Sequence, residues 1–451
     1  RCEGCRGHFS AGHDLFPDRA EGGISVEQFY YERLQETIYH EVMENGLRVY
    51  VLPKPGFRKT YATFATKYGS VDNHFHVAGG DETMVPDGIA HFLEHKMFEE
   101  PEGDIFATFA SNGASANAFT SFDQTVYLFS ATENIETNLE TLVDFVQRPY
   151  FTDENVEKEK GIIGQEINMY ADNPDWRVYF GLIEAMYAKH PVHIDIAGTI
   201  ESIGTITKET LYSCYNAFYH PSNMLLFVVG GVDPEKVITL IRSNQSAKSY
   251  GKQGEIERIF EEEPQAVDQK VRECRLAVSM PKCLFGFKEK VQGLTGEAAI
   301  RRDLTTKLML DLLFGSSTSL YQKLYDEGLI SDSFGHEFNS APEYAFSAIG
   351  GDTKDLDLLL KRIKEEVEAI LKSGFAESDF ERARKKKIGG YLRMLNSPES
   401  IAHEFTRYQF RGGNLFEVLP IYESLTLDEV NDRLRSHVDW EQLAVSLVVS
   451  P

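Results

Sequence analysis

The stretch Gly88-Ile-Ala-His91-Phe92-Leu93-Glu94-His95-Lys96-Met97-Phe98 is the most informative segment of this 451-residue chain. On an α-helix, residues three and four positions apart share a face, so His91, Glu94 and His95 are expected to project together. Two imidazoles one turn apart suit a tetrahedral zinc ion, and a carboxylate beside them can take a proton from an attacking water. The order H-x-x-E-H is the inverted form of the H-E-x-x-H zinc-peptidase motif. The alternative is a surface helix with an ion-paired glutamate and two hydrogen-bonded histidines.

A catalytic zinc site needs a third protein ligand, and the predicted helix from Glu154 to Tyr170 offers candidates. Glu159 and Glu166 are seven residues apart, which places them on the same face two turns apart. Glu166 follows Gly164-Gln165 in a weakly charged stretch, and a carboxylate buried there would need a cation. From this helix alone a solvent-facing Glu166 is the commoner arrangement, so both alternatives stay open.

The chain contains an internal repeat. A predicted helix and strand at residues 206–229 match those at residues 425–448, which start 219 residues later. Residues 151–156 match residues 375–380 at an offset of 224. At this offset Gly390 is the equivalent of Glu166, and Ala383 is the equivalent of Glu159. The second copy has no H-x-x-E-H motif. The first half is therefore the predicted metal half, and the second is a predicted scaffold or substrate wall.

The repeat predicts an α+β fold of two homologous domains, each an antiparallel sheet with helices packed on one face. Strands are predicted at residues 47–52, 61–66 and 125–130, and helices at residues 135–147 and 154–170. The predicted boundaries are a disordered extension over residues 1–26, domains at 27–244 and 271–451, and a solvated linker at 245–270. Cys2-x-x-Cys5, with His8 and His13, also resembles a zinc knuckle, but no hydrophobic pattern surrounds it.

Charge and composition exclude several classes of partner. The chain has 46 basic and 70 acidic residues and a formal charge of −24, which argues against binding to nucleic acid or an anionic membrane. The longest apolar run, Met224–Val232, is far shorter than the roughly 20 residues of a membrane-spanning helix. Five cysteines and no recognisable signal peptide favour the cytoplasm. The run Arg384–Lys387 is expected to be a solvated helix face.

The motif, together with Gly113–Thr120, Glu157–Asn173 and His220–Met224, resembles the M16 (pitrilysin/insulinase-type) zinc metallopeptidases. The likeness covers nearly the whole chain after Glu27 and is greatest to half-size bacterial subunits of subfamily B, of a Bacillus type encoded beside a second M16 protein.

By this resemblance, Zn²⁺ is held by His91, His95 and Glu166, Glu94 is the general base, and Glu159 supports the ligands from behind. It also implies that Ala116, Asn117, Ala118 and Phe119 belong to an edge strand on which a peptide substrate adds as a further β-strand. Without the family, this stretch is only a strand or turn of small residues with Phe119 in the core.

The sequence departs from the family in its second half. That half usually carries an arginine, followed seven residues later by a tyrosine, which reach the substrate and the oxyanion. Here Tyr325 and Ser331 stand at about those positions, and Tyr325 offers no cationic donor. We therefore expect a zinc endopeptidase completed by a second M16-type subunit in a heterodimer. The alternatives are a homodimer or self-sufficient chain, and a peptide-binding or structural subunit that does not cleave.

Overall fold

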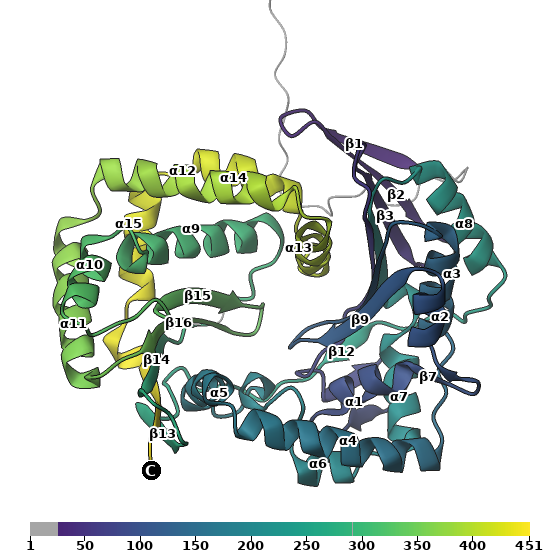
Figure 1. The fold of residues 1–451 in the computed structure, drawn as a ribbon, viewed down its shortest axis with the longest axis horizontal. Coiled ribbons are helices and arrows are strands. Elements are labelled where there is room, and N and C mark those ends of the chain that lie inside the picture. The colour runs from purple at the N-terminus through teal and green to yellow at the C-terminus, as the bar shows by residue number, and fades with distance from the viewer. Residues whose placement is uncertain (1–25, 291) are drawn as a thin grey trace, which may run out of the picture.

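Two sheets with the same strand order form the framework of the chain (Figure 1). The computed structural model describes residues 26–290 and 292–451, so the Cys2-x-x-Cys5 segment lies outside the described residues. In the first half the order is β1-β2-β3-β11-β4-β10-β9. These strands are β1 (Glu27–Tyr31), β2 (Glu36–Val42), β3 (Arg48–Pro53), β11 (Met224–Gly230), β4 (Thr60–Thr66), β10 (Thr125–Ala131) and β9 (Ala114–Thr120).

The second half repeats five of these strands, in the order β13-β17-β14-β16-β15. They are β13 (Val271–Arg275), β17 (Leu443–Val449), β14 (Lys282–Phe287), β16 (Ala345–Asp352) and β15 (Gly335–Ser340). In both halves the first pair, β3–β11 or β13–β17, is parallel and the next three pairs are antiparallel. The predicted α+β fold of two homologous units is confirmed. The parallel pair differs from the expected antiparallel sheet because its strands are joined by the long crossover through the helices of each half.

Helices of each half cover one face of that half's sheet. In the first half these are α1 (Ile89–Met97), α2 (Phe106–Ser111), α3 (Ile135–Val146), α4 (Asp153–Ala171), α6 (Ile200–Gly204), α7 (Lys208–Phe218) and α8 (Pro234–Ser246). In the second half they are α9 (Gly296–Phe314), α10 (Ser319–Asp326), α11 (Leu356–Ser373), α12 (Glu377–Met394), α14 (Val418–Ser424) and α15 (Leu427–His437). The strands and helices predicted from the sequence are confirmed to within one residue at each end.

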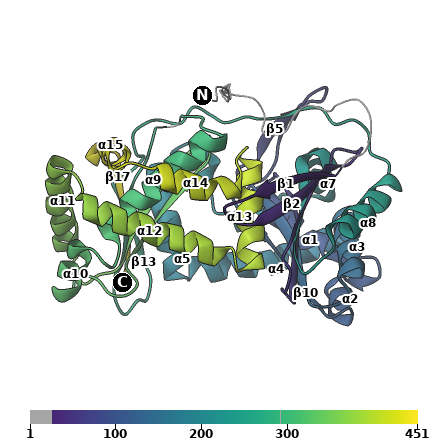
Figure 2. The ribbon, with the colours of Figure 1, turned by 90° about the horizontal axis from the view of Figure 1, so that it is seen from above.

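Two helices are exchanged between the halves. Helix α5 (Pro174–Met186) packs on β13, β14 and β17, whereas α13 (Pro398–Phe410) packs on β4 and β11 (Figures 1 and 2). The rings of Phe227 and Phe405 stack at 4.4 Å on one side, and Met186 joins Phe346 in a core cluster on the other. The second face of each sheet is therefore buried by a helix from the opposite half.

The segment predicted as a solvated linker is ordered against both halves. Ile256–Arg258 forms β12, which pairs with β5 (His74–Val77) beside β6 (Glu82–Met84). The Glu263 carboxylate accepts the backbone N–H groups of residues 188–190 and pairs with the buried Lys288 at 2.6 Å. The acidic composition suggested solvent exposure, but here the carboxylate meets a cation and three backbone donors. Within the described ranges, no helix has both the length and the apolar character needed to cross a membrane.

Candidate metal centre

Helix α1 carries the H-x-x-E-H motif and is held by its apolar side. Phe92 and Leu93 are fully buried in the core of the first half. Gly88 precedes the helix with a φ of +85°, and a Cβ there would lie 2.4 Å from the Ala197 carbonyl oxygen, so this entry requires glycine. Anchored in this way, α1 turns its other face toward α4 and β9.

Three predicted ligands converge between α1 and α4. His91 Nε2 lies 3.7 Å from Glu166 Oε1, and His95 Nε2 lies 3.5 Å from Glu166 Oε2. One donor atom from each residue lies within 4.8 Å of the other two. Tetrahedral zinc with bonds near 2.0–2.1 Å separates its donors by about 3.3 Å, so two imidazoles and one carboxylate at these spacings fit the ion.

Burial makes His91 suitable as a neutral ligand. Its pKa is lowered to about 4, mainly by burial and further by the neighbouring His95. Burial also acts to lower the pKa of His95, but the hydrogen bond to Glu159 and the nearby carboxylates outweigh it and raise that pKa. A metal ion binds the unprotonated imidazole, so zinc would have to displace a proton from His95 more often than from His91.

Glu159 supports the imidazole of His95 from the side opposite the metal ligand atom. Glu159 Oε1 lies 3.1 Å from His95 Nδ1, which leaves His95 Nε2 directed at Glu166. The other oxygen, Oε2, accepts from Lys96 Nζ at 3.4 Å. Burial raises the pKa of Glu159, but His95 and Lys96 outweigh it and lower that pKa overall. A carboxylate in this position would orient His95 if the histidine held a metal ion.

Glu166 is oriented by an aromatic residue that the sequence analysis did not identify. Tyr170 donates its hydroxyl to Glu166 Oε1 at 2.6 Å, and its ring stacks on Trp176 at 4.3 Å. Trp176 in turn donates to Asp195 at 2.6 Å. The i, i+4 spacing of Glu166 and Tyr170 on one helix was the available signal.

Glu94 lies beside the predicted ligands, and in the part of the chain that the structure describes it forms no ion pair with a lysine or arginine. Its Oε2 accepts from the Thr120 hydroxyl at 2.7 Å. Burial raises the pKa of Glu94, opposed in part by Thr120 and His95. Glu94 and His95 open onto a cavity of about 720 Å³ that is also lined by Asn117 and Ala118. The Glu94 carboxylate, His95 as one of the three predicted ligands, and part of β9 therefore line one cavity.

The predicted substrate strand is β9, at the edge of its sheet. The N–H of Ala118 bonds to the Asn117 side chain at 2.9 Å instead of to a neighbouring strand. Ala116 and Ala118 pack toward the core of the first half, while Phe119 contacts the ring of His403 on α13 at 5.1 Å. The structure thus places Asn117 and Ala118 at the cavity, with Ala116 and Phe119 on the same strand.

Tyr325 lies on α10, and Ser331 lies between α10 and β15 in the second half. Tyr325 is half exposed near the end of α10, and Ser331 bonds to Ser333 at 2.8 Å. Helix α10 lies at the left end of the molecule in both views, whereas α1 lies in the right-hand half (Figures 1 and 2). The segment that would carry the family's Arg/Tyr pair therefore lies in the other half from the predicted metal ligands of its own chain.

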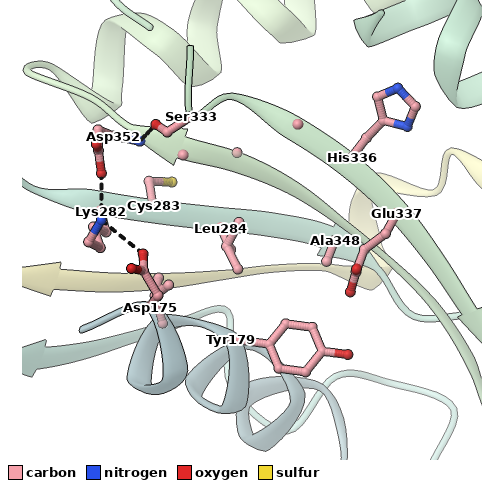
Figure 3. Close-up of a pocket in the computed structure, with 14 residues that line it drawn as sticks. Asp175, Tyr179, Lys282, Cys283, Leu284, Ser333, His336, Glu337, Ala348 and Asp352 are labelled. Carbon is pink, nitrogen blue, oxygen red and sulfur yellow. Dashed lines mark hydrogen bonds and ion pairs between the residues drawn. The ribbon is translucent and has the colours of Figure 1, made fainter. Parts of the chain in front are cut away.

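A second cavity, of about 330 Å³, lies between α5 and the sheet of the second half (Figure 3). Lys282 bridges Asp175 and Asp352 at one end, at 2.8 Å from each, and Tyr179 and Glu337 lie at the other. Leu284 and Ala348 contribute apolar lining between them. This cavity contains none of the predicted site residues.

Comparison with known proteins agrees with the sequence and the fold. The family profile "Insulinase (Peptidase family M16)" matches residues 79–200, and "Peptidase M16 inactive domain" matches residues 205–387. The uncharacterized zinc protease YmfH of Bacillus subtilis (strain 168) is 54% identical over 427 residues, covering 94% of this chain and 99% of the relative.

Solved structures show the same fold. The crystal structure of an M16-like peptidase from Alicyclobacillus acidocaldarius superposes with a TM-score of 0.89 at 41% identity, covering 96% of this chain and all of the other. A protease from Helicobacter pylori has a TM-score of 0.79 at 20% identity, covering 95% of this chain and all of the other, which supports the fold alone. The matching profiles, the half-size relative and the shared architecture lead to one conclusion: this chain belongs to peptidase family M16.

Proposed function

We propose that the chain is a zinc-dependent endopeptidase with His91, His95 and Glu166 as ligands and Glu94 as general base. The observation that supports this best is the convergence of two imidazoles and a carboxylate on one point, beside a buried carboxylate with no cationic partner in the described residues. Relatives named zinc proteases support the same assignment.

A zinc ion held by the three ligands supplies a Lewis acid that activates water and polarises the scissile carbonyl. Glu94 accepts the proton of the attacking water and later delivers it to the leaving amine. Thr120 fixes the Glu94 carboxylate by donating its hydroxyl to Oε2. Glu159 and Tyr170 keep His95 and Glu166 in position.

The substrate in this proposal is an extended peptide that adds to the free edge of β9. The outward N–H of Ala118, now bonded to the Asn117 side chain, would bond to the peptide main chain instead. Main-chain pairing makes little demand on the substrate's side chains, so the proposed specificity is broad.

We further propose that a second M16-type subunit supplies the donors for the oxyanion. Tyr325 lacks a positive charge, and α10 lies at the far end of the second half whereas α1 belongs to the first half, so this segment would face a partner's site more readily than its own. A homodimer would bring only a second Tyr325, which favours a heterodimer. Cytoplasmic location and the absence of a nucleic-acid partner remain predictions.

The test is cleavage of a mixed quenched-peptide library by the purified, zinc-loaded chain, beside Glu94→Gln. We expect Glu94→Gln to lower kcat/KM by about 10²–10⁴-fold while zinc content is unchanged. The matched control is Glu157→Gln, an exposed carboxylate on α4 that pairs only with Lys160 among the described residues, and it should cleave like the wild type.

Equal cleavage by wild type and Glu94→Gln would refute the general-base assignment. If neither cleaves although both hold zinc, the chain is the peptide-binding or partner-dependent form. Adding a second M16 subunit then decides between them, since restored cleavage by the wild type alone identifies the heterodimer.

A further inference from the structure

Lys96 is a charged residue where the helix would more simply carry an apolar one. It is fully buried and directly follows His95 on α1. Removing an ammonium group from water costs several kcal/mol unless nearby carboxylates and hydrogen bonds offset the loss. A methionine or leucine would fill the position without that cost, so the charge itself needs an explanation.

The Lys96 ammonium contacts two carboxylates. It donates to Glu159 Oε2 at 3.4 Å and forms a close ion pair with Glu99 on the short strand β7 (Glu99–Glu100), which pairs with β8 (Gly103–Asp104). Glu159 uses its remaining oxygen for His95 Nδ1 at 3.1 Å. A continuous chain of contacts therefore runs from Lys96 through Glu159 to His95, whose Nε2 lies 3.5 Å from Glu166.

The terminal torsion of a glutamate side chain is soft, so a carboxylate held at one oxygen can rotate. Glu159 is held at both oxygens, by His95 and by Lys96. If Lys96 were apolar, Oε2 would be buried without its charged partner, and Glu159 would gain by turning toward solvent. His95 would then lose the acceptor that fixes its ring orientation and tautomer.

We propose that Lys96 is a positioning residue for the metal: it fixes Glu159 so that His95 keeps its Nδ1–H and presents Nε2 to the ion. This inference rests on the proposed zinc peptidase function. Glu99 anchors the same ammonium from the cavity wall and is not part of the path to His95.

The experiment measures zinc affinity by competition with a chelator and the absorption bands of the cobalt-substituted protein. In Lys96→Met, of similar length but without charge, we expect about 10–100-fold weaker zinc binding and altered cobalt bands. The matched control Glu99→Gln removes the other partner of the same lysine and should stay within about threefold of the wild type. Urea unfolding of the metal-free proteins separates this effect from a general loss of stability.

A double-mutant comparison tests the proposed path. In the Glu159→Gln background the neutral amide no longer needs the lysine, so adding Lys96→Met should not weaken zinc binding further. This pair also leaves no unpaired buried carboxylate at residue 159, and it decides the question if Lys96→Met alone does not fold. Additive losses, or wild-type zinc affinity in Lys96→Met, would overturn the inference.

The outcome can be told apart from failure of the proposed function. If the wild-type chain binds no zinc, or if His95→Ala binds it equally well, the metal site itself is wrong. If the wild type binds zinc through His95 and only the Lys96 variants are unaffected, the metal site stands and the role of Lys96 falls.

Discussion

Within the described residues of the first half, Glu94 and Glu166 meet hydroxyl groups and imidazoles, whereas in the second half Glu289, Asp303 and Asp311 each meet an arginine or a lysine. Glu94 accepts from Thr120. Glu166 accepts from Tyr170 and faces two histidines. The two halves share a strand order, but these carboxylates pair with a lysine or an arginine only in the second half.

The second half neutralises its buried acids with its own side chains. Asp303 pairs with Arg302 at 3.1 Å, Asp311 pairs with Lys386 at 3.0 Å, and Glu289 forms a close pair with Arg433. Such pairs contribute to stability and leave no charge for a ligand. In the first half Glu94 and Glu166, beside the predicted ligand histidines, form no ion pair with a lysine or arginine among the described residues. The two halves thus differ in which of these carboxylates receive a cation from the chain.

Replacing one of these carboxylates in each half by its amide should separate zinc binding from the stability of the fold. Glu166→Gln should weaken zinc binding by about 10³-fold, since it removes one of three ligands from a site worth roughly 10–16 kcal/mol in total. Its metal-free stability should not fall. Asp311→Asn should keep wild-type zinc affinity and lose about 1–3 kcal/mol of unfolding free energy. Chelator competition measures zinc affinity, and urea unfolding measures the stability of the metal-free protein. If either variant lost both zinc affinity and stability, the contrast between the two halves would be wrong.

The buried acid of the second half should make the fold sensitive to low pH. Burial acts to raise the pKa of Glu289, but the hydrogen bond from His437 and the charge of Arg433 outweigh it and lower that pKa to about 2. Because this pKa lies below the ordinary value of 4.5, ionised Glu289 stabilises the fold above pH 4.5, and the contribution disappears as pH falls toward 2.

Glu289→Gln should therefore be about 3 kcal/mol less stable than the wild type at pH 6. The gap should shrink as pH falls below 4.5 and close at about pH 2, because the variant has no carboxylate to protonate at this position. Urea unfolding of both proteins across this pH range provides the measurement. A gap that is constant with pH would show that the loss comes from packing and not from ionisation.

The hydroxyl of Tyr170 should matter for the metal and not for the fold. Tyr170→Phe removes the 2.6 Å hydrogen bond to Glu166, and we expect zinc binding about tenfold weaker. Tyr179→Phe, which removes a hydroxyl from the second cavity, is the control and should bind zinc as the wild type does. Equal affinities in both variants would mean that Glu166 needs no support from Tyr170.

The smallest effect is expected at Gly390, the position in the second copy of the repeat that is equivalent to Glu166. A Cβ added at Gly390 on α12 meets no atom within 4 Å, so Gly390→Ala should raise the unfolding free energy by about 0.5–1 kcal/mol and leave zinc affinity unchanged. The control is Gly350→Ala, where the Cβ would lie 2.0 Å from the Cys283 carbonyl oxygen and should destabilise the sheet. Destabilisation by Gly390→Ala would contradict the open helix face.

The sequence was sufficient for the face of α1 and for the sheet framework. His91, Glu94 and His95 share a face because the helical period fixes it, and Glu159 and Glu166 follow from the same rule on α4. Apolar runs such as Met224–Val229 identified central strands because strands buried on both faces are apolar throughout. The assignment of His91, His95 and Glu166 as ligands, and of Glu94 as base, came from the motif and the family resemblance, and it stays a prediction.

Contacts between elements could not be read from the sequence. Thr120 and Lys96 gain their roles only when β9 and α4 pack against α1. The exchange of α5 and α13 was not predicted, because an amphipathic pattern shows that a helix has a buried face but not which sheet covers it. The contacts of Glu263 in the predicted linker could not be read either, since this residue meets its partners from distant parts of the chain.

The exchange of helices also delays the burial of the first sheet during protein synthesis. The last strand of the first sheet ends at residue 230, but α13, which covers its second face, ends only at residue 410. At roughly 5–20 residues per second, a ribosome needs roughly 10–40 s to make the intervening 180 residues. During that interval Tyr61, Leu225 and Phe227 lack their cover. The nascent chain therefore presents an apolar surface to chaperones until translation is nearly complete, and the two halves reach their native state together.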